Sequence, residues 1–160
     1  MHRPSRQVIA AVMAAVGGLA CQGGEGSGSG GPGAPGPGHA MCHITADYPH
    51  ESSGTPGSIV GKVRAVCTAA IDSLTFEAKL QEQIKGTWAD VGQPDARSVA
   101  PVVANEKYTV QAAVPCPADG SARVYRTAGR GAGVYGGNPA KSADWQYSSP
   151  IGREVKCRTR

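Results

Sequence analysis

Several patterns that identify common classes of protein are missing from this sequence. The chain has no run of about 20 apolar residues of the kind that spans a membrane. It has no Cys-x-x-Cys pair that would predict a zinc site and no Gly-x-Ser-x-Gly nucleophile elbow. No pair of carboxylates stands out as a general acid and base. The sequence therefore predicts a protein that is not an enzyme and that binds no cofactor or metal ion.

The charge of the chain also says little about its partner. The net charge is +4 at pH 7, and the basic residues are not densely clustered, so nucleic acid is a poor candidate partner. Residues 123–160 nevertheless hold eight basic and two acidic residues. This excess either favours an anionic surface, such as phospholipid headgroups or wall polymers, or is ordinary solubilising charge.

The N-terminus has the composition of a signal peptide. Arg3 and Arg6 precede an uncharged, apolar segment at residues 8–20, which is the order of a basic n-region and an apolar h-region. Gly18 and Ala20 are small residues of the kind that signal peptidase needs just before a cut. The sequence predicts a signal peptide at residues 1–20 and an extracellular protein.

Cys21 directly follows the predicted cut. Gly-Leu-Ala-Cys resembles a bacterial lipobox, although a lipobox usually has leucine where this chain has Gly18. The chain has five cysteines, and an unpaired, exposed thiol is a liability in an oxidising compartment. We therefore predict that Cys21 is lipidated and anchors the protein to the outer face of the cytoplasmic membrane. The alternative is an incidental cysteine beside an ordinary cut, which leaves the protein freely secreted.

A linker is predicted at residues 21–40. Nine of the 18 positions from residue 23 to residue 40 are glycine and three are proline, and such a segment cannot bury enough surface to fold. A flexible chain of this length spans about 23 Å on average. The linker would separate the membrane anchor from a folded domain at residues 41–160.

Alternation of apolar and polar residues predicts that this domain is all-β. Short strands separated by turn sequences favour an antiparallel sandwich, which we expect to be immunoglobulin-like, or a barrel. Weaker strands are expected at residues 87–91, 98–103, 122–127 and 145–147. The residues predicted to face inward are Cys42, Ile44, Ala46, Tyr48, Ile59, Val63, Ala65, Cys67, Leu74, Phe76, Ala78, Leu80, Tyr108, Val110, Ala112, Val114, Cys116, Ile151, Val155 and Cys157.

One segment also fits a helix. Residues 76–85 are rich in helix formers, and Phe76, Leu80 and Ile84 lie at helical spacing. We predict a strand because the alternation from Leu74 is strict and the neighbouring segments are strands.

The four cysteines of the domain predict two disulfides. Four cysteines allow three pairings, and the sequence alone does not choose among them. We prefer Cys67–Cys116, which would join two central strands, and Cys42–Cys157, which would clasp the first strand to the last. A metal site is disfavoured because no two cysteines are close in the sequence.

The domain resembles a known group of proteins. The stretch C-H-I-T-A-D-Y-P-H-E-S-S-G-T-P-G-S-I-V-G-K-V, the Val-Cys at Cys67, the Ala-Val-Pro-Cys at Cys116 and the terminal cysteine look like small secreted actinobacterial proteins of unknown function. The resemblance covers most of residues 41–157. It implies a disulfide-bonded β-sandwich and no particular activity.

Residues 131–136, Gly-Ala-Gly-Val-Tyr-Gly, match the dinucleotide-binding fingerprint literally. The fingerprint functions only between a strand and the start of a helix, whereas glycine and proline follow here. We expect a flexible surface loop. Its Val134 and Tyr135, with Trp145 and Tyr147, either contact a ligand such as a glycan or cap the end of the sandwich.

His43, Asp47 and His50 form a candidate metal site, because imidazole and carboxylate bind divalent ions. Positions four apart on a strand are separated by about 13 Å, however, which is too far for one ion. We expect this stretch to be a strand exit at which Pro49 ends the pairing. Ser52, which lies near His50 in sequence, does not by itself indicate a catalytic triad.

The predicted function is that of a secreted, lipid-anchored cell-surface domain. It would act as a non-catalytic binding or structural module of the bacterial envelope. Its partners would be the membrane, through the lipid anchor, and an unknown envelope or extracellular protein or polymer. The alternatives are a freely secreted effector or signalling protein and a small metal-dependent enzyme with its site at His43, Asp47 and His50.

Overall fold

The computed structural model of the protein describes residues 18–21, 40–140 and 144–158. These residues form strands, and no helix able to cross a membrane occurs among them. The strands are β1 (Gly18–Cys21), β2 (Ala40–Ala46), β3 (His50–Glu51), β4 (Ser58–Cys67), β5 (Ser73–Ile84), β6 (Thr87–Val99), β7 (Lys107–Pro115), β8 (Arg123–Tyr135), β9 (Asn138–Pro139), β10 (Gln146–Tyr147) and β11 (Arg153–Val155).

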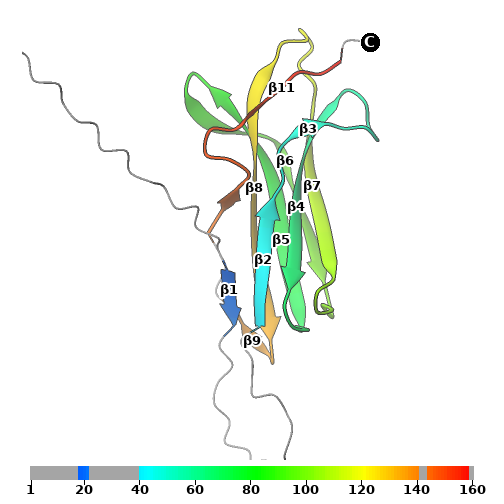
Figure 1. Ribbon diagram of the computed structural model, residues 1–160, viewed down its shortest axis with the longest axis vertical. Coiled ribbons are helices and arrows are strands. Elements are labelled where there is room, and N and C mark those ends of the chain that lie inside the picture. Colours follow the sequence, from blue (N-terminus) through cyan, green and yellow to red (C-terminus); the bar gives the residue numbers. More distant parts are fainter. Residues whose placement is uncertain (1–17, 22–39, 141–143, 159–160) are drawn as a thin grey trace, which may run out of the picture.

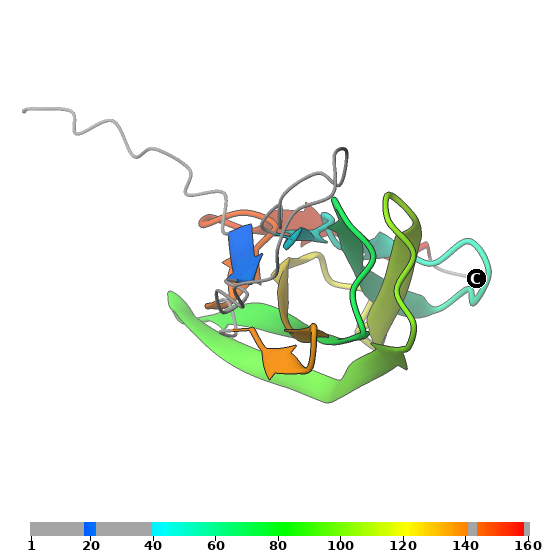
Figure 2. The ribbon, with the colours of Figure 1, turned by 90° about the horizontal axis from the view of Figure 1, so that it is seen from below.

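The strands make two antiparallel sheets that lie face to face (Figures 1 and 2). In the first sheet β4 is central: β2 and β3 pair with one edge of it, β7 pairs with the other edge, and β1 pairs with β2. In the second sheet β5 lies between β6 and β8, while β9, β10 and β11 pair with β8. The prediction of an all-β, antiparallel, sandwich-like fold is confirmed.

The core lies between the sheets and consists mainly of the residues that the alternation placed inward. Phe76, Ile59 and Leu74 are among its largest fully buried side chains. Residues 76–84 are strand, as predicted, and Ile84 of the rejected helical stripe is 47% exposed. Tyr48 was predicted to face inward and is 52% exposed, because β2 ends at Ala46 before it. Ile151 is 78% exposed, which also contradicts the prediction, and it precedes β11.

The two weak strands expected at residues 87–91 and 98–103 are largely one long strand, β6. The turn sequence Gly-Gln-Pro-Asp between them forms an irregularity inside β6, opposite a register shift between Ala78 and Leu80 of β5. Gly92 has φ 69°, a conformation that glycine adopts readily. A Cβ at Gly92 would lie 2.5 Å from Val114 of β7. The turn residues therefore curve β6 towards β7 (Figure 2).

The glycine-rich residues 131–136 were expected to form a flexible loop, and this prediction is wrong. Most of them belong to β8, on which Gly129, Gly131 and Gly133 are buried at alternate, inward positions. A Cβ on Gly129 would lie 2.6 Å from Val63 of β4. Glycine is needed at these three positions because core side chains lie where a Cβ would be, with the closest approach at Gly129.

Two disulfides are present, as predicted, but their pairing differs from the preferred one. Cys42 pairs with Cys67 and Cys116 with Cys157. Cys42 and Cys67 are directly opposite on β2 and β4. The Thr68 amide donates to the Met41 carbonyl at 2.8 Å, which makes the cysteines a non-hydrogen-bonded pair, the closer of the two antiparallel pair types.

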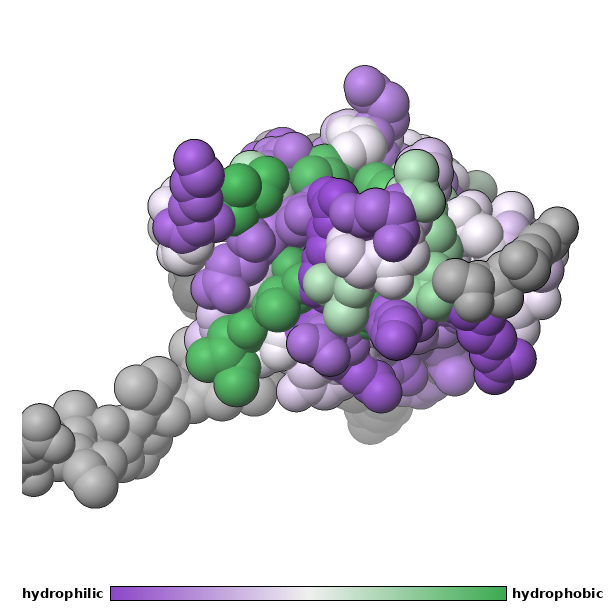
Figure 3. Space-filling view, turned by 90° about the horizontal axis from the view of Figure 1, so that it is seen from above, coloured by the Kyte–Doolittle hydropathy of each residue, from purple (hydrophilic) through white to green (hydrophobic). Residues whose placement is uncertain are grey.

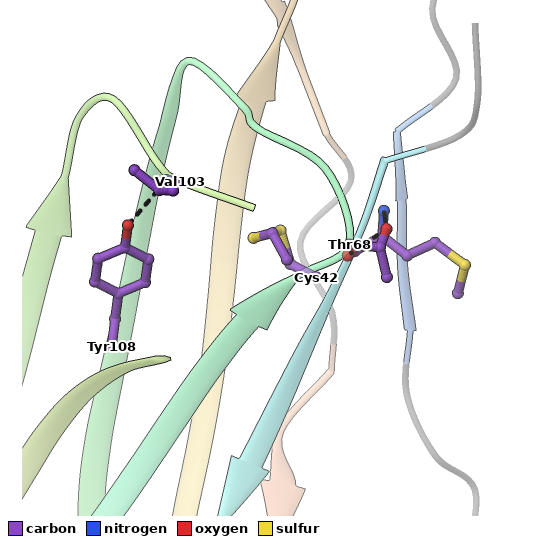
Figure 4. The surroundings of a disulfide bond; sticks show 6 residues. Cys42, Thr68, Val103 and Tyr108 are labelled. Atoms are coloured by element: carbon purple, nitrogen blue, oxygen red, sulfur yellow. Dashed lines mark hydrogen bonds between the residues drawn. A yellow bond between two sulfur atoms is a disulfide. The ribbon is translucent and has the colours of Figure 1, made fainter. Parts of the chain in front are cut away.

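Figure 4 shows Thr68 beside this disulfide and, on a neighbouring loop, the Val103 amide donating to the Tyr108 hydroxyl. The second disulfide joins the segment after β11 to the end of β7. Cys67–Cys116 and Cys42–Cys157 were wrong because strand order, which the alternation does not reveal, places β2 beside β4.

The predicted signal peptide and linker lie mostly outside the described residues, which begin at residue 18 and omit residues 22–39. Gly18–Cys21 form β1, antiparallel to β2, with Cys21 opposite Ala40.

Candidate functional site

The outer face of the second sheet carries an ordered set of aromatic and charged side chains, which we call the outer-face site. Antiparallel register brings them together, because outward residues of neighbouring strands stand directly opposite each other. Glu77 of β5 is opposite Arg130 of β8, and Gln81 of β5 is opposite both Arg126 of β8 and Asp90 of β6. The members of the site are Glu77, Lys79, Gln81, Trp88, Asp90, Arg126, Arg130, Trp145 and Tyr147.

One row of the site crosses three strands. Arg126 Nε donates to Gln81 Oε1 at 2.7 Å, and Gln81 Nε2 donates to Asp90 Oδ1 at 2.6 Å. The guanidinium of Arg126 lies 4.3 Å from the ring centre of Trp88 and 4.0 Å from that of Tyr147. Each such cation–π contact contributes about 0.5–2 kcal/mol, depending on how far it is desolvated.

The charges in this row shift the pKa values of two groups. The hydrogen bond from Gln81 and the nearby cations Lys79 and Arg126 lower the pKa of Asp90, against an opposing effect of burial. Burial lowers the pKa of Arg126, and the nearby Tyr147 and Asp90 oppose this. The lowered pKa keeps Asp90 ionised at neutral pH, and Arg126 is a cation there because a guanidinium stays protonated well above neutral pH.

A second group centres on Trp145. Lys79 Nζ lies 4.2 Å and the Arg130 guanidinium 4.6 Å from the ring centre of Trp145. Lys79 also forms an ion pair with Asp90 at 2.9 Å, and Arg130 forms one with Glu77. The two groups of the site are linked, because Asp90 accepts from both Gln81 and Lys79.

These side chains form a second layer over the sheet. Ala128 points outward on β8, between Arg126 and Arg130, yet it is 0% exposed. Gln81, also outward, is 8% exposed. The layer holds the rings in place, while Tyr147 remains 43% exposed.

An open depression of about 290 Å³ lies in the same face and shares Arg130 with the group around Trp145. Its outward-facing wall residues include Thr75, Glu77 and Arg130. The Thr75 hydroxyl is 2.9 Å from the Ser98 hydroxyl on β6. The depression is thus lined by a carboxylate, a guanidinium and a hydroxyl, and its guanidinium, that of Arg130, also lies against the Trp145 ring.

The structure does not bring His43, Asp47 and His50 together as metal ligands. Asp47 pairs instead with Arg64 of β4, and the amide of Asp47 donates to the Lys62 carbonyl. His50 Nδ1 lies 3.2 Å from the Tyr48 carbonyl oxygen. The predicted strand exit is correct only in part: pairing stops after Ala46 but resumes at His50, which pairs with Val60 of β4, so Pro49 interrupts the pairing and does not end it.

One group of potential metal ligands does lie close together, namely Glu51, Cys116 and Cys157. Both of its sulfurs are joined in a disulfide, so neither is a thiolate ligand. Glu51 accepts a hydrogen bond from the Arg158 amide at 3.0 Å. This cluster secures the C-terminal segment.

The basic residues of the C-terminal third that the structure describes have different partners on different strands. Arg126 and Arg130 belong to the outer-face site. Arg123 pairs with Glu82 at 3.1 Å, and Arg153 lies 6.0 Å from the ring centre of Tyr48. At the end of the sandwich seen in Figure 3, hydrophobic and hydrophilic residues are intermingled. The charge excess thus does not form one anion-binding patch among the described residues.

Trp145 and Tyr147 were singled out from the sequence, and they lie on the outer face of the sheet rather than over its end. The cations beneath the rings, and Trp88, were missed. The available signal was the presence of Lys79, Arg126 and Arg130 at outward strand positions. No protein-family model matches the chain, and no curated protein is similar to it in sequence.

Proposed function

We propose that this protein is a secreted component of the bacterial envelope, held by a lipid on Cys21, whose immunoglobulin-like sandwich is a non-catalytic binding or structural module. The two disulfides support an extracellular location, because disulfides persist in oxidising compartments. The resemblance to small secreted actinobacterial proteins belongs to the same proposal.

The observation that carries the proposal is the outer-face site. Tryptophan, tyrosine and arginine dominate the energetics of binding surfaces. Tryptophan and tyrosine do so because they give large contact areas with few rotatable bonds. Here Arg126 holds Trp88 and Tyr147, and Lys79 and Arg130 hold Trp145. Side chains that are fixed before a partner arrives lose little entropy on binding. The side chains of the outer-face site are thus preorganised for binding.

The proposed anchor fits the placement of this site. Ala40 begins β2 at one end of the sandwich, while β11 and the C-terminal segment lie at the other (Figure 1). The site lies along the side of the second sheet, whereas the linker would enter at Ala40. An anchored domain would therefore leave the outer face open to a partner. Cleavage before Cys21 would also remove three of the four residues of β1.

The anchor is tested by mass spectrometry of the native protein from separated membrane and medium fractions. We expect an N-terminal peptide that begins with a diacylglyceryl cysteine at residue 21, found in the membrane fraction. Recovery from the medium with an unmodified Cys21 would refute the anchor and indicate a freely secreted effector or signalling protein.

The binding role is tested with the Cys21→Ser protein, which is secreted without the lipid. We expect it to sediment with purified envelope from the producing cells. Tyr147→Ala should reduce this binding, and Tyr48→Ala is the matched control, because the two rings are 43% and 52% exposed on different parts of the sandwich. Equal sedimentation of both variants and the parent protein would contradict a role for the outer-face site.

A further inference from the structure

We propose that the partner of the outer-face site is an uncharged saccharide chain, stacked on Trp145 and hydrogen-bonded in the depression beside it. This inference rests on the proposed function and names the chemical class of its ligand. A pyranose ring has an apolar face of C–H groups and a rim of hydroxyls. It therefore needs an aromatic surface and, next to it, groups that both donate and accept hydrogen bonds.

The site supplies both parts at one place. The Trp145 ring is held over Arg130, whose guanidinium lies 4.6 Å from the ring centre. Arg130 also lines the depression, together with Glu77 and Thr75. A sugar on Trp145 would therefore meet a guanidinium, a carboxylate and a hydroxyl within the same depression.

Hydrogen-bonding capacity remains in these groups. The ion pair with Glu77 uses Nε of Arg130, while a guanidinium has five N–H donors and a carboxylate has about four acceptor sites. The hydroxyls of Thr75 and Ser98 bond to each other, and each hydroxyl has one donor and two acceptor positions. Sugar hydroxyls, which donate and accept, match this mixed set.

The balance of charge favours an uncharged ligand. Around Trp145, Arg130 is compensated by Glu77 and Lys79 by Asp90. The third cation of the outer-face site, Arg126, lies against Trp88 and Tyr147 instead. A polyanion would be attracted by the two cations and repelled nearly as strongly by the two carboxylates, since attractive and repulsive Coulomb energies largely cancel at similar distances. A neutral polar chain is subject to neither this attraction nor this repulsion.

The shape of the site favours a chain over a compact small molecule. The depression is open, whereas pockets for small ligands enclose most of the ligand surface. Its walls come from β5, β6 and β8, so it crosses the sheet. A polymer that contacts the site with one or two residues, and continues past it, satisfies this geometry.

The test uses the full chain, labelled with ¹⁵N, and its two tryptophans. Four hexasaccharides serve as probes: maltohexaose, cellohexaose, mannohexaose and chitohexaose. We expect at least one of them to move the Trp145 indole signal saturably while the Trp88 signal, farther along the sheet, stays in place. Trp145→Ala should weaken binding by at least about tenfold, the loss typical of a central aromatic contact.

Two further measurements test the saccharide assignment even if Trp145→Ala perturbs folding. Glu77→Gln should weaken binding by about threefold to tenfold, because a neutral acceptor replaces a charged one. Binding should also be nearly independent of salt, whereas ionic recognition of a polymer weakens steeply as salt rises. Affinity that falls steeply with salt, or that Glu77→Gln leaves unchanged, would overturn the saccharide assignment.

The failures of the two proposals are distinguishable. If no hexasaccharide moves the Trp145 signal at several millimolar, while envelope binding still depends on Tyr147, the saccharide assignment is wrong and the binding module stands. If envelope binding is also indifferent to Tyr147, both proposals are wrong.

Discussion

Thr127 buries a hydroxyl in the core that forms no hydrogen bond to any of the described residues. Its side chain is 0% exposed, and within the described part of the chain its Oγ1 has no hydrogen-bond partner. It faces Gly61 of β4, where an added Cβ would lie 2.4 Å from Oγ1. The backbone of Thr127 bonds instead to Ser148, with N···Oγ 3.0 Å and O···N 2.9 Å. Thr127→Val replaces only the hydroxyl and leaves these backbone bonds intact.

We expect Thr127→Val to raise the free energy of unfolding by about 1–2 kcal/mol. A buried hydroxyl without a partner costs about 1–3 kcal/mol, and the added methyl group gains about 0.8 kcal/mol from burial. The close approach of Gly61 opposes this gain, because a methyl group is larger than a hydroxyl and overpacking is destabilising.

Urea unfolding at constant pH measures the effect. The midpoint should rise by about 0.5–1 M at an unchanged slope, for a slope of about 2 kcal/mol/M, in the middle of the range for small proteins. Thr45→Val, at an exposed position of β2, is the matched control and should change stability by less than about 0.5 kcal/mol. A lower midpoint for Thr127→Val would refute the prediction, because it would mean that the hydroxyl forms a stabilising hydrogen bond in the core or that the added methyl group overpacks the contact with Gly61.

Two further predictions test the packing of the sheets and the charges of the site. Gly129→Ala should lower the free energy of unfolding by about 1–3 kcal/mol, because its Cβ would lie 2.6 Å from Val63; Gly54→Ala, with no atom within 4 Å, should be nearly neutral, and equal effects in thermal unfolding would contradict the packing. Asp90→Asn should destabilise the protein at pH 7. The hydrogen bond from Gln81 is the main cause that holds the pKa of Asp90 below 3.8 in the folded state, and the nearby cations lower it further. A group of this kind stabilises the fold above its unfolded pKa and loses that contribution as pH falls through the folded pKa, so urea midpoints of variant and parent should converge below pH 3.8; a constant difference across the series would contradict the shift.

Alternation in the sequence was enough to predict which residues of the long strands face the core. In β5 it distinguished a strand from a helix, because Leu74, Phe76 and Leu80 are buried while Ile84 is not. It was not enough to predict which strands are neighbours. All four domain cysteines pair, but only the order β2–β4 explains why Cys42 meets Cys67, and strand order depends on long-range packing.

Glycine was misread for a related reason. Single-residue propensity disfavours glycine in strands, so residues 131–136 looked like a loop. The spacing of Gly129, Gly131 and Gly133 by two was itself a strand pattern, with the smallest side chain at each inward position. The sequence does not show which residues of the other sheet face each glycine. The need for glycine becomes apparent only once Val63 is placed opposite Gly129.

The same strand explains how the core and the outer-face site are coupled. β8 presents glycines to the core at 129 and 131 and cations to the outside at Arg126 and Arg130. Since a Cβ at Gly131 would lie 3.0 Å from Ile44 and 3.2 Å from Phe76, β8 lies against the core without slack. Side chains on a strand held this closely are positioned more precisely than side chains on a loop. Gly131→Ala would push β8 away from the core. It should therefore displace Arg130 from its position beneath the Trp145 ring, and so change the outer-face site although none of the site's own residues is substituted.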